Sequence, residues 1–200
     1  MSRWPRTFLV RHGETEWNRV ERLLSHTDMD LNATGQEQAL RLGNDLAEAG
    51  VRFDRIVSSP LVRARRTAEL IAGQLVASPR VVLDDRLVEL DFGVLEGWTE
   101  AQLAGDPAAA AWRSGADHPG VETEASVAIR AASFWPEIPS TGTTLVVSHG
   151  RFLRVLLATC VLGVPAEIGR SMRMRNCRPA IVEPGPKPLL LGFNAGPPYG

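Results

Sequence analysis

The chain has 200 residues, a formal net charge of -1 and 44% hydrophobic residues. This length and composition predict one globular domain over residues 1–200. The nearly balanced charge excludes a general electrostatic attraction to nucleic acid or to anionic membranes. We expect a cytoplasmic protein with reduced thiols, because the sequence has no signal peptide, no long apolar span and no CxxC pair at Cys160 or Cys177.

Buried strands are predicted where short apolar runs interrupt segments with helical spacing. These runs lie at about residues 6–10, 54–58, 80–83 and 144–148. The alternation of such strands with helices is typical of an α/β protein with a mostly parallel sheet. Two further strands are predicted near 180–183 and 189–193, and the prolines between them favour a hairpin at the edge of the sheet.

Helical spacing predicts two long helices in the first half of the chain. Apolar residues recur every three or four positions from Gly35 to Ala49, and Gly50 follows as a helix stop. A second helix is predicted over 61–75, with a serine of residues 58–59 as its N-cap and Pro60 in its first position. Arg63 then falls in the first turn, where backbone amides already favour anions.

Two later segments differ from these helices. Residues 98–122 contain two short helical pieces interrupted by Gly, Asp-Pro and a glycine-bounded loop, and they predict a small cap-like insertion. Residues 152–157 are apolar nearly all round and predict a buried helix directly after His149.

Histidines follow two of the predicted parallel strands. The strand over 6–10 leads into Arg11-His12, and the strand over 144–148 leads into His149. Open α/β sheets build their sites at the carboxyl ends of such strands. A neutral imidazole can attack a phosphoryl group while a planar guanidinium holds its oxygens. This placement therefore indicates phosphoryl chemistry.

Other motifs for phosphate or metal chemistry are absent from the sequence. A P-loop requires a lysine after its glycines, whereas the single lysine, Lys187, lies in the proline-rich tail. No strand is followed by GxGxxG, neither cysteine has an arginine six residues later, and the DxD at 28–30 lacks the threonine of DxDxT. Without HxH, HExxH or paired Cys/His spacing, we expect no metal and no cofactor.

Four blocks of the sequence carry a family resemblance. They read LVRHGETEWN at 9–18, SSPLVRA at 58–64, ELDFGVLEG at 89–97 and SHG at 148–150. In this order they resemble the signatures of the histidine phosphatase (phosphoglycerate mutase-like) superfamily, over about residues 6 to 193. The resemblance implies a three-layer α/β/α sandwich with a small cap insertion, and a metal-free phosphohistidine mechanism.

The resemblance also implies a role for each site residue. His12 would take the phosphoryl group onto a ring nitrogen, and Glu89 would protonate the leaving oxygen and then deprotonate the attacking water. The residues implied to bind the phosphoryl oxygens are Arg11, Asn18, Arg63 and His149. For Asn18, a structural role in bracing the first helix is the alternative.

The expected function is hydrolysis of a small phosphorylated metabolite. Mutases of the family carry a basic, tyrosine-bearing stretch after the acid/base glutamate, whereas Glu89 is followed here by Leu-Asp-Phe-Gly. A phosphoglycerate-type mutase and a catalytically silent phospholigand-binding protein are the alternatives. The second is disfavoured because binding alone needs neither His12 nor Glu89.

Three features of the sequence concern the pocket wall and association of the chain. The cap residues Trp112 and Arg113 lie where they could contact substrate, but Trp112 also suits core packing. Residues 120–123 read Gly-Val-Glu-Thr where relatives carry Gly-Gly-Glu-Ser, which indicates a different pocket wall. The sequence leaves a homodimer open, because an apolar face used for association has the same pattern as one used for the core.

Overall fold

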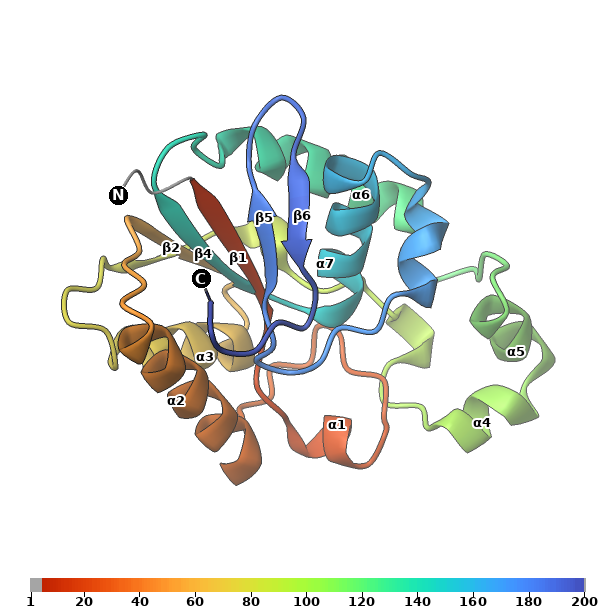
Figure 1. Cartoon of the computed structure of the whole chain (residues 1–200). Coiled ribbons are helices and arrows are strands. Elements are labelled where there is room, and N and C mark those ends of the chain that lie inside the picture. The colour runs from red at the N-terminus through yellow and green to blue at the C-terminus, as the bar shows by residue number, and fades with distance from the viewer. Residues whose placement is uncertain (1–4, 200) are drawn as a thin grey trace.

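The computed structural model describes residues 5–199 and is built around a six-stranded sheet (Figure 1). Its strands are β1 (Arg6–Arg11), β2 (Arg55–Ser58), β3 (Val81–Leu83), β4 (Thr143–Ser148), β5 (Ala180–Glu183) and β6 (Leu189–Gly192). They are arranged in the order β3-β2-β4-β1-β5-β6. The first four pair in parallel, β5 pairs antiparallel with β1, and β6 pairs antiparallel with β5. The prediction of a mostly parallel sheet with an edge hairpin is confirmed.

The central strands are buried on both faces, because alternate side chains point to opposite sides of a sheet. In β1, Phe8 and Val10 belong to one hydrophobic core and Leu9 to the other. The same alternation separates Val57 from Ile56 in β2. Strands buried in this way read as continuous apolar runs, which is the pattern that made them recognisable in the sequence.

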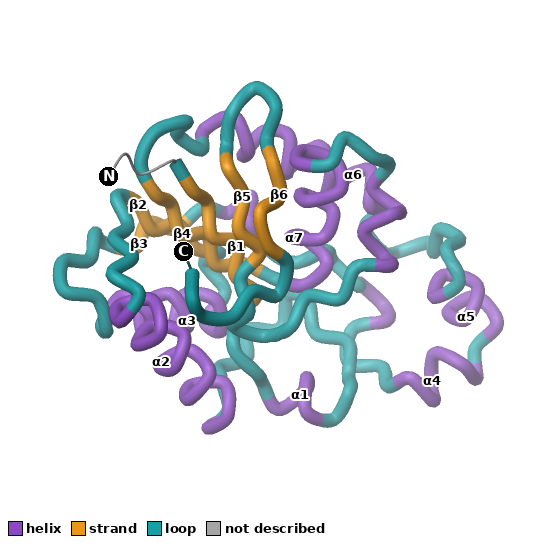
Figure 2. Tube along the Cα trace, in the orientation of Figure 1, coloured by secondary structure: helices purple, strands orange, loops and turns teal. Residues whose placement is uncertain are grey.

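Helices cover the two faces of the sheet and complete three layers (Figures 1 and 2). One core contains apolar residues of α2 (Ala33–Glu48) and α3 (Val62–Ala72). The other contains residues of α6 (Glu124–Phe134) and α7 (Gly150–Leu156). A π-helical turn over Leu157–Val161 continues α7. The chain therefore has the expected three-layer α/β/α architecture.

The start of α3 corrects one prediction. The helix begins at Val62, and its N-cap, Leu61, has extended backbone angles and provides no side-chain hydrogen bond. Pro60 therefore precedes the helix instead of opening it. The amide of Val62 donates to Asp28 Oδ1 at 2.7 Å. The first helical amide is thus capped from a distant loop, and the Ser59 hydroxyl oxygen accepts only from the preceding amide of Leu61, at 3.4 Å.

The start of α2 packs closely against the loop that follows β1. Asn32 caps this helix by accepting a hydrogen bond from the amide of Gly35 at 2.8 Å, and it donates to Glu14 Oε1 at 2.9 Å. A Cβ atom on Gly13 or Gly35 would overlap backbone atoms of the facing segment. Glycine at both positions lets α2 define the path of the chain directly after His12.

Two short helices, α4 (Glu100–Gly105) and α5 (Pro107–Arg113), form a projection beyond α6 and α7 (Figure 1). They match the two helical pieces expected within residues 98–122. Short α1 (Glu16–Arg19) lies in the segment between β1 and α2. No helix within residues 5–199 is long and apolar enough to cross a membrane.

Candidate active site

The pairing of β1 with β4 brings His12 and His149 together. The two strands run parallel in a register that aligns Arg11 with Ser148, so the next residue of each chain segment lies at the same edge of the sheet. The amide of His12 continues the ladder by donating to the carbonyl of Ser148 at 2.9 Å. The two imidazole centroids are 5.2 Å apart. The sheet topology therefore creates the histidine pair that the sequence predicted.

His12 is held as a neutral ring with one nitrogen free. Its Nδ1 lies 2.7 Å from the carbonyl oxygen of Gly13, which can only accept, so Nδ1 carries the proton. Burial, followed by the nearby cations Arg63 and Arg11, holds the pKa of His12 well below 6.5. Nε2 then has an unprotonated lone pair, which is the form that a nitrogen nucleophile requires.

His149 is the N-cap residue of α7 and is completely buried. Burial, and then the charge of Arg63, also holds its pKa well below 6.5. Its Nε2 lies 2.8 Å from the hydroxyl oxygen of Ser59. If the Ser59 hydroxyl donates to Nε2, the proton of the neutral ring is on Nδ1 and can be donated to a ligand.

Arg63 is a fully buried guanidinium in the first turn of α3. Its terminal nitrogens donate to the carbonyls of Thr27 at 3.0 Å and Ser25 at 2.5 Å. The amides of the same two residues donate to Glu96 Oε1. Burial lowers the pKa of Arg63 to about 10, so the side chain is still a cation at neutral pH. The loop over 25–27 is thus clamped between a carboxylate and a guanidinium.

Several predicted site residues have buried polar atoms without partners. Six such side-chain atoms occur within residues 5–199, and four belong to predicted site residues. These four are Arg11 Nε, Asn18 Oδ1, Arg63 Nε and His149 Nδ1. Folded proteins leave few buried polar groups unpaired, so this concentration fits a site that binds a polar ligand. The amide of Asn18, not its side chain, takes part in the first helix by donating to Thr15 Oγ1.

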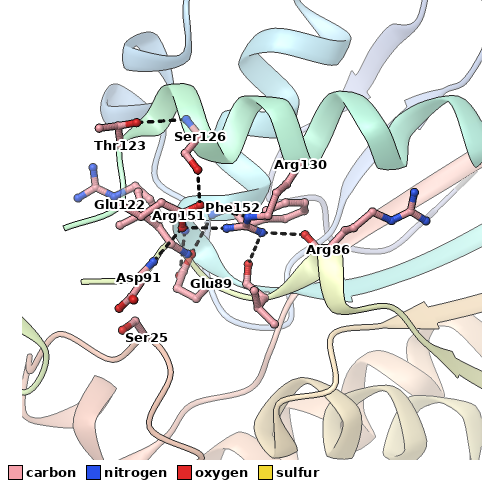
Figure 3. Close-up of polar contacts among 12 residues, drawn as sticks. Ser25, Arg86, Glu89, Asp91, Glu122, Thr123, Ser126, Arg130, Arg151 and Phe152 are labelled. Atoms are coloured by element: carbon pink, nitrogen blue, oxygen red, sulfur yellow. Dashed lines mark hydrogen bonds and ion pairs between the residues drawn. The ribbon is translucent and has the colours of Figure 1, made fainter. Parts of the chain in front are cut away.

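Glu89 is held at the start of α7 by backbone amides. Its Oε1 accepts from the amides of Phe152 at 2.9 Å and Leu90 at 3.0 Å, and its Oε2 accepts from the amide of Arg151 at 3.1 Å (Figure 3). The carboxylate is almost fully buried but still lines a cavity. Three amide donors fix its position while one edge faces the space where a substrate can bind.

That cavity has a volume of about 430 Å³. Arg11, Asn18 and Glu89 line it, whereas His12, Arg63 and His149 are buried and do not. Further arginines complete its wall: Arg22, Arg113, Arg151, Arg154 and Arg173. Arg113 of the cap therefore faces the cavity and pairs there with Glu100 at 2.5 Å. Trp112 instead packs in the core, with its ring 5.7 Å from that of Phe92.

All six predicted site residues thus lie in one region, but other contributors were missed. Asn176 donates from Nδ2 to the carbonyl of His12 at 2.7 Å and lines the cavity. Thr67 accepts from the amide of Gly13 at 3.0 Å and donates to the carbonyl of Arg63 at 2.7 Å. The position of Thr67, one helical turn after Arg63, was the available signal. No sequence pattern around Asn176 indicates that it contributes to the site. Within residues 5–199, no three His, Cys, Asp or Glu side chains are grouped as metal ligands.

Comparisons with known proteins identify relatives over nearly the whole chain. The chain is 37% identical over 193 residues to a protein named probable phosphoglycerate mutase GpmB of Erwinia tasmaniensis, covering 92% of this chain and 86% of that protein. The alpha-ribazole phosphatase of Shigella flexneri has a similar structure, with a TM-score of 0.81 and 28% identity over 95% of this chain and 96% of the other.

Phosphoserine phosphatase of Entamoeba histolytica, solved with 3-phosphoglyceric acid, gives a TM-score of 0.81 and 28% identity, covering 96% of this chain and 98% of the other. The family profile described as histidine phosphatase superfamily (branch 1) matches residues 7–191. The profile match includes residues of all six strands and every block that suggested phosphoryl chemistry, so the chain belongs to branch 1 of the histidine phosphatase superfamily.

Proposed function

We propose that this chain is a metal-independent phosphomonoesterase that acts on a small phosphorylated metabolite through a phosphohistidine at His12. The observation that carries the proposal is a neutral His12 with Nε2 free, surrounded by buried polar atoms that have no partner in the protein. Arg11 and Arg63 lie close enough to this nucleophile for their charges to lower the pKa of His12. A phosphate monoester provides the anionic oxygens that such an arrangement binds.

In the first step, the lone pair on His12 Nε2 attacks phosphorus and the bond from phosphorus to the ester oxygen breaks. Arg11 Nε, Arg63 Nε and His149 Nδ1 donate to the phosphoryl oxygens. Asn18 can join them only through its Nδ2, because its unpaired Oδ1 is an acceptor. Protonated Glu89 gives its proton to the leaving oxygen. The products are the free alcohol, a phosphohistidine and the Glu89 carboxylate.

In the second step, the phosphohistidine is hydrolysed. The Glu89 carboxylate takes a proton from a water molecule as the water oxygen attacks phosphorus. The bond between phosphorus and Nε2 breaks, which releases inorganic phosphate and restores both the neutral imidazole and the protonated carboxyl group. No group other than water is consumed.

The size and walls of the cavity favour a small-molecule substrate. Small-ligand pockets have volumes of about 300–1,000 Å³, and this cavity has a volume of about 430 Å³. Two similar structures are named for phosphatase activity, on α-ribazole phosphate and on phosphoserine. The small cavity and the similarity to these two phosphatases support hydrolysis of a small phosphate ester by this chain.

A phosphoglycerate-type mutase is the second candidate, because the 37% identical relative carries that name. A mutase must present groups that keep the phosphoglycerate in place and water out. Here Leu90 and Phe92, which follow the acid/base carboxylate, are buried apolar residues, and Phe92 lines the cavity where a mutase is expected to carry a basic, tyrosine-bearing stretch. This difference favours hydrolysis.

The test is phosphate release from p-nitrophenyl phosphate with EDTA present, from acidic to neutral pH, in the wild type and in His12→Ala. We expect activity in the wild type and none in the variant. The phosphohistidine is expected as a mass increase of one phosphoryl group in the intact wild-type protein after a neutral quench.

Equal activity in both proteins would refute His12 as the nucleophile. Transfer between 2- and 3-phosphoglycerate with little free phosphate would instead support the mutase. Phosphate-ester binding without either reaction would support a catalytically silent phospholigand-binding protein.

A further inference from the structure

A buried ion pair lies directly behind the segment that carries Glu89. Arg130 of α6 donates to Glu122 through Nε at 3.2 Å and through a terminal nitrogen at 3.0 Å. Both side chains are largely buried, with 22% and 16% of their areas exposed. Neither lines the cavity, and the polar atoms of both are bonded to each other and to the backbone of residues 86–91. Glu122 lies within residues 120–123, for which the sequence indicated a different pocket wall, but it does not line this cavity.

This ion pair holds both sides of Glu89 (Figure 3). On the amino-terminal side, Arg130 donates to the carbonyls of Arg86 at 2.8 Å and Val88 at 3.1 Å. On the carboxyl-terminal side, Glu122 Oε2 accepts from the amide of Asp91 at 3.0 Å. The amide of Glu122 also donates to the carbonyl of Asp91 at 2.8 Å. Residues 86–91 are thus fixed at both ends by one ion pair.

A second connection runs through the ring of Phe152. The guanidinium of Arg130 lies 5.3 Å from the centroid of this ring. The amide of Phe152 is one of the three donors that hold the Glu89 carboxylate. Arg130 therefore supports the backbone that carries Glu89 and contacts a residue that binds its carboxylate.

We propose that Glu122 and Arg130 are positioning residues for Glu89, which set the distance between its carboxyl group and the leaving oxygen of the substrate. The proposal rests on the proposed role of Glu89 as the acid and base. A general acid works only within hydrogen-bond reach of its target, and a displacement of about 1 Å can cost on the order of 10²-fold in rate. The Glu122–Arg130 pair prevents that displacement without taking part in the chemistry.

The test uses the dependence of the rate on the leaving group. An alkoxide leaving from β-glycerophosphate needs the proton of Glu89, whereas the phenolate leaving from 2,4-dinitrophenyl phosphate does not. The values of kcat/KM for the two esters report phosphoryl transfer to His12 alone, because later hydrolysis of the phosphoenzyme does not enter them. The variants are Arg130→Met, which keeps an apolar stem against Phe152, and Glu122→Gln, which keeps the shape but loses the charge.

We expect kcat/KM for β-glycerophosphate to fall by roughly 10- to 100-fold in both variants. For 2,4-dinitrophenyl phosphate we expect a change of less than about threefold, since its departure needs no general acid. Arg130→Lys keeps the cation but has at most three donors on one nitrogen, whereas the guanidinium makes four hydrogen bonds, so it should give an intermediate loss. This milder variant also covers the case in which Arg130→Met does not fold.

Arg86→Met is the matched control. Its side chain forms ion pairs with Asp84 at 2.6 Å and Glu137 at 2.7 Å, and its other side-chain hydrogen bond goes to the carbonyl of Ser133, not to residues 88–91. This variant should lower the melting temperature and leave the ratio of the two kcat/KM values unchanged. An equal loss for both esters in Arg130→Met and Glu122→Gln would overturn the inference, since a purely structural defect affects both substrates alike.

Glu89→Gln distinguishes a failure of the proposed acid role of Glu89 from a failure of the positioning role of Glu122 and Arg130. A loss confined to β-glycerophosphate in Glu89→Gln supports the acid role, and the outcome for Arg130→Met then decides the inference alone. If Glu89→Gln shows no dependence on the leaving group, or if the wild type hydrolyses neither ester, the proposed function fails and the inference fails with it.

Discussion

The neutral state of His12 and His149 predicts a specific dependence of stability on pH. Burial first, and then the charge of Arg63, holds both pKa values well below 6.5 in the folded protein. In the unfolded chain, both rings return to an ordinary pKa of about 6.5. Below that pH the unfolded state binds more protons than the folded state. The free energy of unfolding is therefore fully retained above pH 6.5 and falls as the pH drops from 6.5 toward the lower folded-state pKa values.

The size of this loss in unfolding free energy follows from the number of protons that each state binds. One pKa unit corresponds to about 1.4 kcal/mol. Between pH of about 7.5 and about 5.5, each ring that is neutral in the folded state should therefore reduce the free energy of unfolding by about 1.4 kcal/mol. The two histidines together should account for about 3 kcal/mol over this range. Carboxylates of ordinary pKa contribute little here, because they titrate mainly below this window.

The assay is urea unfolding at these two pH values, followed by tryptophan fluorescence, for the wild type, His12→Gln, His149→Gln and the double variant. Each single variant should lose about 1.4 kcal/mol of the pH-dependent difference, and the double variant about twice that amount. All other titrating groups are shared by the four proteins, so the comparison isolates the two rings. If His12→Gln has the same pH dependence as the wild type, the pKa of His12 is the same in the folded and unfolded chain, and burial does not hold the ring neutral.

Two further substitutions test the surroundings of this pair. Arg63→Met should lower kcat/KM for p-nitrophenyl phosphate by about 10²- to 10³-fold, since it removes one donor to the transferring phosphoryl group. Arg65→Met, in the same helix but exposed, should leave it unchanged, and equal losses in both would contradict the assignment. Glu124→Ala should lower the free energy of unfolding by about 3 kcal/mol in urea denaturation, because Arg151 and Arg170 both pair with this buried carboxylate. A loss under about 1 kcal/mol would show that the two guanidiniums are satisfied without it.

Local patterns in the sequence were sufficient to predict the strands and the histidine pair. Buried parallel strands are short apolar runs, and each of the six observed strands lies within a residue or two of its predicted position. Parallel strands expose their carboxyl ends at one edge of the sheet. His12 and His149 could therefore be expected to meet without any knowledge of the register that brings them to 5.2 Å.

Only the tertiary structure determined the contacts between residues that lie far apart in the chain. The first helical amide of α3, that of Val62, is capped by Asp28, whereas Ser59 contacts His149 and accepts only from the amide of Leu61. Asn176 supports the backbone of His12 from 164 residues away. A hydrogen bond of this kind depends on where two separate segments cross, and neither segment carries a local pattern that records the crossing.

The same reason explains why the support of Glu89 was invisible in the sequence. The residue itself stands in a recognisable block, but Glu122 and Arg130 look like ordinary charged positions near and within a surface helix. Packing of α6 against α7 places that ion pair behind residues 86–91. The sequence by itself thus determined which side chains could perform phosphoryl chemistry. The folded chain determined their protonation and their partners, because burial and distance between remote segments exist only after the layers have packed.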